Sequence, residues 1–174
     1  MVKIYCINSQ TSMCFQEGTT LLEMLNSFEF DRPYPILCAK VNNVSQGLKY
    51  RAFNNRTVEF MDYRSYIGRS VYSNSLCFLL CKSASDLFPG CKVVLRRPIS
   101  KGYFCTIDKQ DGTEFSDDDL KSLTDRMIRL VEMDLPFRRH EAPLDEAVKV
   151  FRDFGYQDKV SLLETTGDVY VNYY

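Results

Sequence analysis

The sequence lacks both an excess of charge and a long apolar segment. Its 174 residues include 22 Lys and Arg against 23 Asp and Glu, a net charge of −1, so the whole molecule has no field that attracts nucleic acid or an anionic membrane. No segment approaches the roughly 20 apolar residues of a membrane span, and the first residues lack the apolar core of a signal peptide. We therefore expect a cytoplasmic protein without a membrane partner.

Motifs that hold cofactors or metals are also missing. The chain contains no GxxxxGK[ST], GxGxxG, HExxH or GxSxG, and its one histidine is His140. The seven cysteines form no CxxC pair, which in a reducing compartment favours buried apolar roles. Cys77 and Cys81 are one helical turn apart, but a tetrahedral metal site needs two more ligands. We expect neither metal nor cofactor in this chain.

Two further constellations leave alternatives open. A nucleophilic thiol would have to pair with His140, and Cys77 or Cys105 could supply it, although nothing in the sequence brings them together. The run Asp117-Asp118-Asp119 could bind a cation, but it follows Ser116 and precedes an apolar helical repeat. Carboxylates there stabilise the positive end of a helix, so the pattern favours a helix cap.

The content of 45% hydrophobic residues is enough for one large or two small cores. Residues 1–62 predict a hairpin (3–8 and 12–16), a helix opened by the capping box Thr20-x-x-Glu23, and strands at 36–41 and 57–61. The apolar side of this helix is expected to consist of Leu21, Leu22, Leu25 and Phe28. This order is that of a β-grasp fold, in which one helix covers one face of a mixed sheet.

Residues 63–174 predict a second α+β unit after a polar link at 63–69. Expected helices cover 73–88, a segment capped by Ser116, 144–154 and 158–163, and expected strands cover 92–97, 102–107, 137–141 and 169–174. The first helix is expected to pack Leu76, Leu80, Ala84 and Leu87 inward. The second is expected to carry its apolar stripe on Leu120, Leu123, Met127, Ile128, Leu130 and Val131. The predicted fold class of the whole chain is therefore α+β.

Several motifs resemble a known pair of domains. The opening hairpin, Gly18-Thr19-Thr20-Leu21-Leu22-Glu23, Ala39-Lys40-Val41-Asn42 and residues 54–62 resemble a TGS domain, the ubiquitin-like module at the N-terminus of threonyl-tRNA synthetase. Residues 87–92, 98–104, 115–127 and 134–137 resemble the domain that follows it there, which alanyl-tRNA synthetase and free-standing editing proteins also contain. The resemblance implies a TGS domain at 1–62 and an editing-like domain at 63–174, truncated at its C-terminus.

The editing relatives hydrolyse mischarged tRNA with a His-x-x-x-His helix. The resemblance places these two positions at Asn74 and Phe78, and the acidic residue of a neighbouring strand at Thr106. The family's Cys-x-x-x-His element would fall beyond Tyr174. An amide and a phenyl ring neither ligate a metal nor exchange a proton near neutral pH. We therefore expect no catalytic residues in this chain.

The same helix positions could line a binding site instead. Asn74 and Phe78 would face a groove, next to a basic segment that carries Arg96, Arg97, Lys101 and the aromatic Tyr103. These six residues are the predicted ligand site, for a small ligand such as an amino acid, for a nucleotide, or for RNA. Alternatively, the hairpin covers Phe78, and the basic residues are solvated strand ends facing the acidic segment 108–119.

A TGS domain joined to an editing-like domain without histidines also resembles the N-terminal region of bacterial uridine kinase-like proteins. That resemblance implies a nucleoside kinase domain in cis, with ATP and magnesium bound there and not in this chain, and a fragment that is monomeric alone. The predicted function is a non-catalytic binding or regulatory module. A tRNA-editing deacylase and a structural spacer without a ligand are the alternatives.

Overall fold

The computed structural model describes residues 1–99 and 102–174, without the side chains of residues 97–99. The chain divides into two compact units, Met1–Phe78 and Leu79–Tyr174. The division falls inside helix α2 (Tyr66–Leu87). The predicted domain boundary after residue 62 stays a prediction, and the two units are described separately below.

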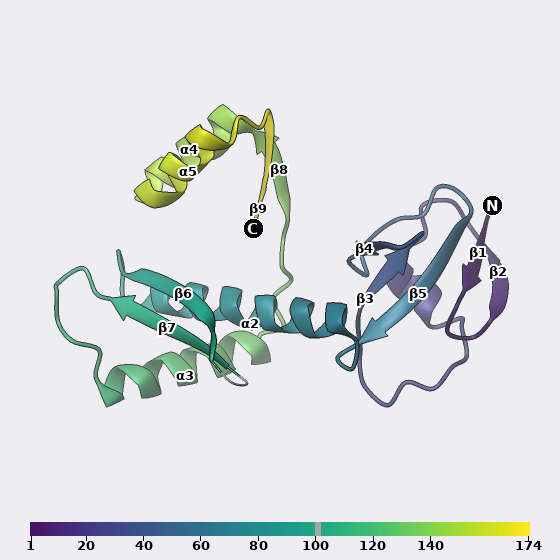
Figure 1. Cartoon of the computed structure of the whole chain (residues 1–174), viewed down its shortest axis with the longest axis horizontal. Coiled ribbons are helices and arrows are strands. Elements are labelled where there is room, and N and C mark those ends of the chain that lie inside the picture. The colour runs from purple at the N-terminus through teal and green to yellow at the C-terminus, as the bar shows by residue number, and fades with distance from the viewer. Residues whose placement is uncertain (100–101) are drawn as a thin grey trace. The chain divides into compact units, whose positions relative to one another are not determined.

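The first unit is built on a five-stranded mixed sheet (Figure 1). Its strands are β1 (Val2–Cys6), β2 (Thr11–Phe15), β3 (Ile36–Val41), β4 (Val44–Gln46) and β5 (Arg56–Asp62), in the order β2-β1-β5-β3-β4. Strands β1 and β5 are parallel, and the other neighbours are antiparallel. The prediction of a mixed sheet within an α+β fold is confirmed, although the short strand β4 is not anticipated by the sequence pattern.

One face of this sheet is covered by the short helix α1 (Leu21–Leu25). The predicted capping box is present, with the Thr20 side chain accepting from the Glu23 amide at 3.3 Å and the Glu23 carboxylate accepting from the Thr20 amide at 2.7 Å. The side chains that enter the core are Leu21, Met24, Leu25 and Phe28. The prediction that Leu22 is buried was wrong, because the i, i+3, i+4, i+7 positions face the sheet and Leu22 lies about 100° away.

Helix α2 begins earlier than its sequence indicates. The Ser65 hydroxyl accepts a hydrogen bond from the Gly68 amide at 2.9 Å and donates one to the Asp62 carbonyl. Ser65 therefore caps a helix that starts at Tyr66, and the prediction of a polar link over 63–69 was wrong. Asp62 also binds Arg64 through the amide and the guanidinium, and these hydrogen bonds lower the pKa of its carboxyl group.

The second unit contains two antiparallel strand pairs and several helices (Figure 1). Strands β6 (Lys92–Ile99) and β7 (Gly102–Asp108) pair with each other and precede helix α3 (Asp117–Glu132). Strand β8 (His140–Pro143), helices α4 (Leu144–Asp153) and α5 (Gln157–Thr166), and strand β9 (Tyr170–Tyr173) follow, with β8 paired to β9. Strand β8 begins three residues later than predicted. Among the described residues, no helix combines the length and apolarity needed to cross a membrane.

Apolar helix positions are less buried than their spacing predicts. In α3 only Leu123 and Leu130, seven residues apart, are buried, whereas Leu120, Ile128 and Val131 are more than half exposed. In α2, Ala84 is buried as predicted, but Leu76 and Leu87 are exposed, which corrects the predicted inward stripe. At about 100° per residue, Leu123 and Leu130 lie within about 20° of each other at one edge of the predicted α3 stripe, so the neighbouring elements cover that edge and leave the rest of the stripe accessible.

Candidate functional site

Two of the predicted ligand residues lie on α2. Asn74 and Phe78 are both exposed, and their four-residue spacing places them on the same side of the helix. Phe78 keeps 40% of its surface accessible, which is high for an aromatic side chain of this size. Both residues belong to the first unit.

Two others lie on the β6–β7 hairpin of the second unit. Arg96 is exposed and sits where the register shifts between Leu95 and Pro98, while Tyr103 pairs with Pro98 and is 49% exposed. The side chain of Arg97 and the whole of Lys101 lie outside the described residues. The structure thus brings Arg96 and Tyr103 onto one hairpin, and a site that joins them to Asn74 and Phe78 stays a prediction.

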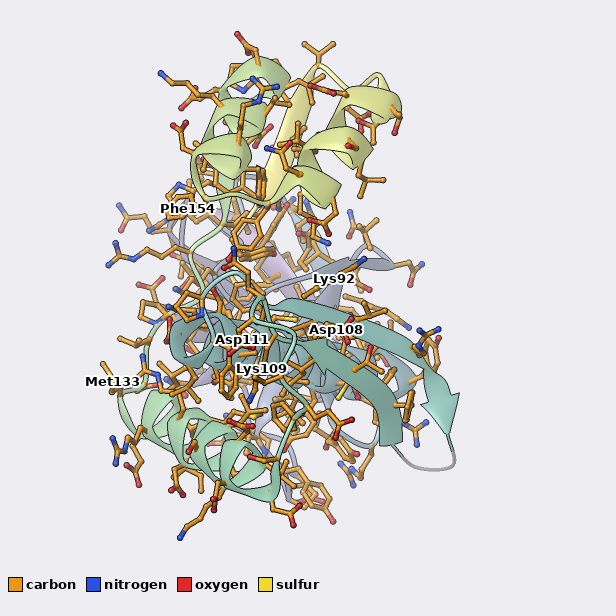
Figure 2. The ribbon with its side chains drawn as sticks, turned by 90° about the vertical axis from the view of Figure 1, so that its left-hand side faces the viewer. Lys92, Asp108, Lys109, Asp111, Met133 and Phe154 are labelled. Carbon is orange, nitrogen blue, oxygen red and sulfur yellow. The ribbon has the colours of Figure 1, made fainter. Side chains whose placement is uncertain are left out.

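The acidic run at the start of α3 forms the predicted cap. The Ser116 hydroxyl accepts from the Asp119 amide at 3.2 Å, and the Asp119 carboxylate accepts from the Ser116 amide at 2.8 Å. Figure 2 labels Lys109 beside Asp108, the last residue of β7. Lys109 donates to the Asp119 carboxylate at 2.6 Å and lies over the Phe88 ring. The hydrogen bond from Lys109, followed by those from Ser116, lowers the pKa of Asp119 to about 2. This cluster joins the hairpin to α3.

The rival catalytic pair is not assembled within the second unit. His140 is exposed on β8 and stacks on Tyr173 with ring centroids 5.5 Å apart. Cys105 pairs with Leu95 on the other hairpin, and no hydrogen bond joins it to His140 in the described part of the chain. Residues 1–99 and 102–174 also contain no group of three or more His, Cys, Asp and Glu placed to hold a metal ion.

Sequence reasoning missed two shallow hollows in the first unit, which meet at Asn42 and Thr57. Their volumes are about 290 Å³ and about 340 Å³. The residues that line them are Lys3, Tyr5, Ile7, Ser12, Lys40, Asn42, Asn43, Asn55, Arg56, Thr57 and Glu59. The alternating burial of β1, with Ile4 buried and Tyr5 exposed, places these hollows on the sheet face opposite the core. The alternation of polar and apolar residues over the first six positions indicates that one side of β1 is exposed, but it does not reveal which strands lie beside β1.

Backbone hydrogen bonds fix the amide side chains at this face. The Asn55 Oδ1 accepts from the Lys3 amide at 2.8 Å, and the Asn42 Oδ1 accepts from the Thr57 amide at 2.9 Å. Asn42 adopts a positive φ of 48° in the turn between β3 and β4, a conformation that asparagine tolerates better than most residues. Lys40 and Glu59 are paired across β3 and β5, and the Lys40 Nζ and Glu59 Oε2 atoms form an ion pair at 3.6 Å.

Comparison with known proteins connects most of the chain to one kind of protein. It is 27% identical over 152 residues to the threonine–tRNA ligase of Desulforamulus reducens, covering 87% of this chain and 23% of the ligase. The chain is also 28% identical over 115 residues to the ligase of Fusobacterium nucleatum, covering 66% of this chain and 18% of the ligase. It is 25% identical over 160 residues to the ligase of Cytophaga hutchinsonii, covering 92% of this chain and 25% of the ligase. No protein-family model matches the chain. The chain spans about a quarter of the length of the curated relatives it matches.

Proposed function

We propose that this chain is a non-catalytic module that binds tRNA or a related RNA. The observation that carries the proposal is the similarity to threonine–tRNA ligases over 87% of the chain. These relatives are threonine–tRNA ligases, which act on tRNA, and the part of them that resembles this chain supports a contact with tRNA. The TGS and editing-like domain assignments belong to the same proposal.

The exposed side chains of both units supply groups suited to RNA. Tyr103 and Phe104 leave about half of their surfaces accessible on the β6–β7 hairpin, next to the exposed Arg96. Aromatic rings stack on unpaired bases, and arginine contacts phosphate. Asn74 and Phe78 on α2 stay in the proposal as residues that contact a ligand.

The proposal that this chain does not catalyse editing depends on the side chains at the two expected histidine positions. At the two positions where the resemblance expects histidines, Asn74 and Phe78 have no group that titrates near neutral pH. The remaining histidine, His140, stacks on Tyr173 and makes no hydrogen bond to Cys105 within the described chain. Editing by another set of residues is therefore the alternative that an activity assay must decide.

A nucleoside kinase domain in cis is supported by the sequence resemblance alone. The relatives named above are ligases, and the chain itself carries no phosphate-binding loop. Binding of RNA by this chain is proposed independently of what the parent protein catalyses. A regulatory role toward a kinase would follow only if such a domain were present.

Binding is tested with fluorescently labelled tRNA(Thr) and an unrelated tRNA, by anisotropy at several salt concentrations. We expect saturable binding that weakens as salt rises, because phosphate contacts release counterions. The variant Arg96→Glu should weaken binding, whereas Arg152→Glu, on an exposed side chain of α4, serves as the charge-matched control. Absence of binding at low salt would contradict the proposal and support a spacer without a ligand.

Activity is tested by incubating the protein with tRNA(Thr) mischarged with amino acids other than threonine. Under the proposal, release of the amino acid equals that in buffer alone. Release above this level would establish editing, and loss of that release in His140→Ala but not in Asn74→Ala would assign the chemistry to the histidine.

A further inference from the structure

We infer that the open sheet face of the first unit, at the two hollows that meet at Asn42 and Thr57, binds an unpaired segment of RNA. The inference rests on the proposed function and names a contact surface for it. This surface shares no residue with the predicted ligand site on α2 and the β6–β7 hairpin.

The hydrogen bonding of this face leaves donors exposed. Because the Oδ1 atoms of Asn42 and Asn55 already accept backbone N–H groups, the NH₂ groups of both amides are the atoms left for a ligand. The hydroxyl groups of Tyr5, Ser12 and Thr57 add groups that donate or accept. Such a face matches the phosphate oxygens and base carbonyls of RNA, which are acceptors.

The charge of the face has the sign that RNA requires. Its lining contains three cations, Lys3, Lys40 and Arg56, against the single carboxylate of Glu59. Lys40 is paired with Glu59, whereas Lys3 and Arg56 have no ion-pair partner among the described residues. In a chain with a net charge of −1, this is a local positive patch.

The shape and aromatic content favour single-stranded RNA. Tyr5 is 41% exposed on the open face of β1, and Ile7, in the turn that follows β1, is also 41% exposed. A sheet that presents an exposed ring beside cations stacks unpaired bases, whereas bases in a duplex are already stacked. Each hollow is close to the lower limit of about 300 Å³ for ligand pockets, so each suits one base rather than a large cofactor.

The test uses the whole chain with a labelled heptauridylate and with labelled tRNA(Thr), followed by anisotropy. We expect Tyr5→Ala to weaken oligonucleotide binding by between about fivefold and about a hundredfold, because one stacking contact is lost. Tyr5→Phe should bind within about twofold of the parent, because the ring that stacks is retained. Lys3→Gln should lower the salt dependence of log affinity by about 0.7, the value for one phosphate contact with a single strand.

Two control variants match these changes elsewhere in the same unit. Tyr34→Ala removes a tyrosine that is 51% exposed but outside the hollows. Lys49→Gln removes an exposed lysine in the loop whose Leu48 carbonyl accepts from α1. Both should bind as the parent chain does. Backbone amide shifts at Lys3, Tyr5 and Thr57 on addition of heptauridylate provide a measurement that needs no variant.

The outcomes separate this inference from the proposed function. If the parent chain binds tRNA, but Tyr5→Ala and Lys3→Gln bind equally well and these amide shifts are absent, the inference is wrong and the proposed function stands. If the parent chain binds neither heptauridylate nor tRNA(Thr), the inference and the proposed function are both wrong. A concentration-dependent dimer that Tyr5→Ala dissociates would show that a second copy covers this face, which also overturns the inference.

Discussion

The two units differ in what fills their interiors. The first has a contiguous cluster of large buried side chains, among them Ile4, Met24 and Phe28, from the sheet and from α1. In the second, the described residues that are buried are mostly small or isolated: Ser83, Ala84, Leu123, Leu130, Ala142, Ala147, Val148 and Val160. The first unit is therefore held together mainly by burial of apolar surface, which is the dominant favourable term in folding.

The second unit depends more on polar contacts between its elements. Arg126 of α3 donates to Asp86 of α2 at 2.6 Å, and Lys109 joins the hairpin to the cap of α3. Large apolar side chains such as Phe104, Val131 and Phe154 are each about half or more exposed. Each such polar contact contributes little in water, so we expect the second unit to tolerate most single truncations and to be the less stable of the two.

The largest expected effect comes from emptying the core of the first unit. Phe28 is fully buried, with its ring 5.8 Å from Phe15 and 6.3 Å from Phe60. Phe28→Ala should lower the free energy of unfolding by about 3–5 kcal/mol. Phe104→Ala, at a half-exposed ring of the second unit, should cost less than about 1 kcal/mol. Urea denaturation followed by amide spectra of each unit measures both, and equal losses would contradict the contrast between the units.

The second prediction concerns the junction between β5 and α2. A Cβ atom at Gly68 would lie 1.9 Å from the Asp62 carbonyl oxygen, whereas one at Gly47 would meet nothing within 4 Å. Gly68→Ala should therefore destabilise the first unit by about 1–3 kcal/mol through overpacking. Gly47→Ala should change its stability by less than about 1 kcal/mol. Thermal melts of the two variants measure the difference, and similar melting temperatures would show that α2 shifts freely away from the sheet.

The sequence predicts the first unit better than the second, for a physical reason. Alternation of polar and apolar residues located β1, β3 and β5, because each of these strands buries one regular face, and the capping box located the start of α1. The start of α2 was missed because Ser65 takes its partners from Asp62 and Gly68 through a turn that periodicity does not reveal. In the second unit, apolar spacing predicted for α3 a stripe of which only Leu123 and Leu130 are buried in the described structure.

The candidate sites show the same limit. The resemblance selected Asn74 and Phe78, and the local charge pattern selected Arg96 and Tyr103. All four are exposed, but sequence alone cannot place two units relative to each other. The hollows around Tyr5 depend on pairing between β1, β3 and β5, segments up to 52 positions apart in the sequence. Which strands become neighbours is a property of the whole sheet, so local patterns did not reveal this face.

A smaller effect is expected from the two capping boxes. In α1, the Leu21 and Leu22 amides donate to the carbonyls of Tyr50 and Leu48, so the helix start is held without its cap. Ser116→Ala should cost about 1–2 kcal/mol and Thr20→Ala about 0.5 kcal/mol, the upper and lower parts of the range for lost caps. Chemical denaturation measures both losses. A larger loss for Thr20→Ala would show that the loop bonds do not substitute for the cap.

The smallest effect, a shift in titration without unfolding, compares the same two boxes. The pKa of Asp119 is lowered to about 2, first by the hydrogen bond from Lys109, and that of Glu23 is lowered, first by the Thr20 amide. The stabilising effect of the Asp119 carboxylate is therefore complete above its ordinary pKa of 3.8 and is lost as the pH falls through about 2. In Lys109→Met, the pKa of Asp119 should rise toward 3.8 while that of Glu23 stays unchanged, as measured by carbon-13 chemical shifts of the side-chain carboxyl groups. An unchanged Asp119 pKa would show that the Ser116 cap alone sets its titration, and that Lys109 contributes to the second unit through its contacts with Phe88, Phe115 and the Glu114 carbonyl.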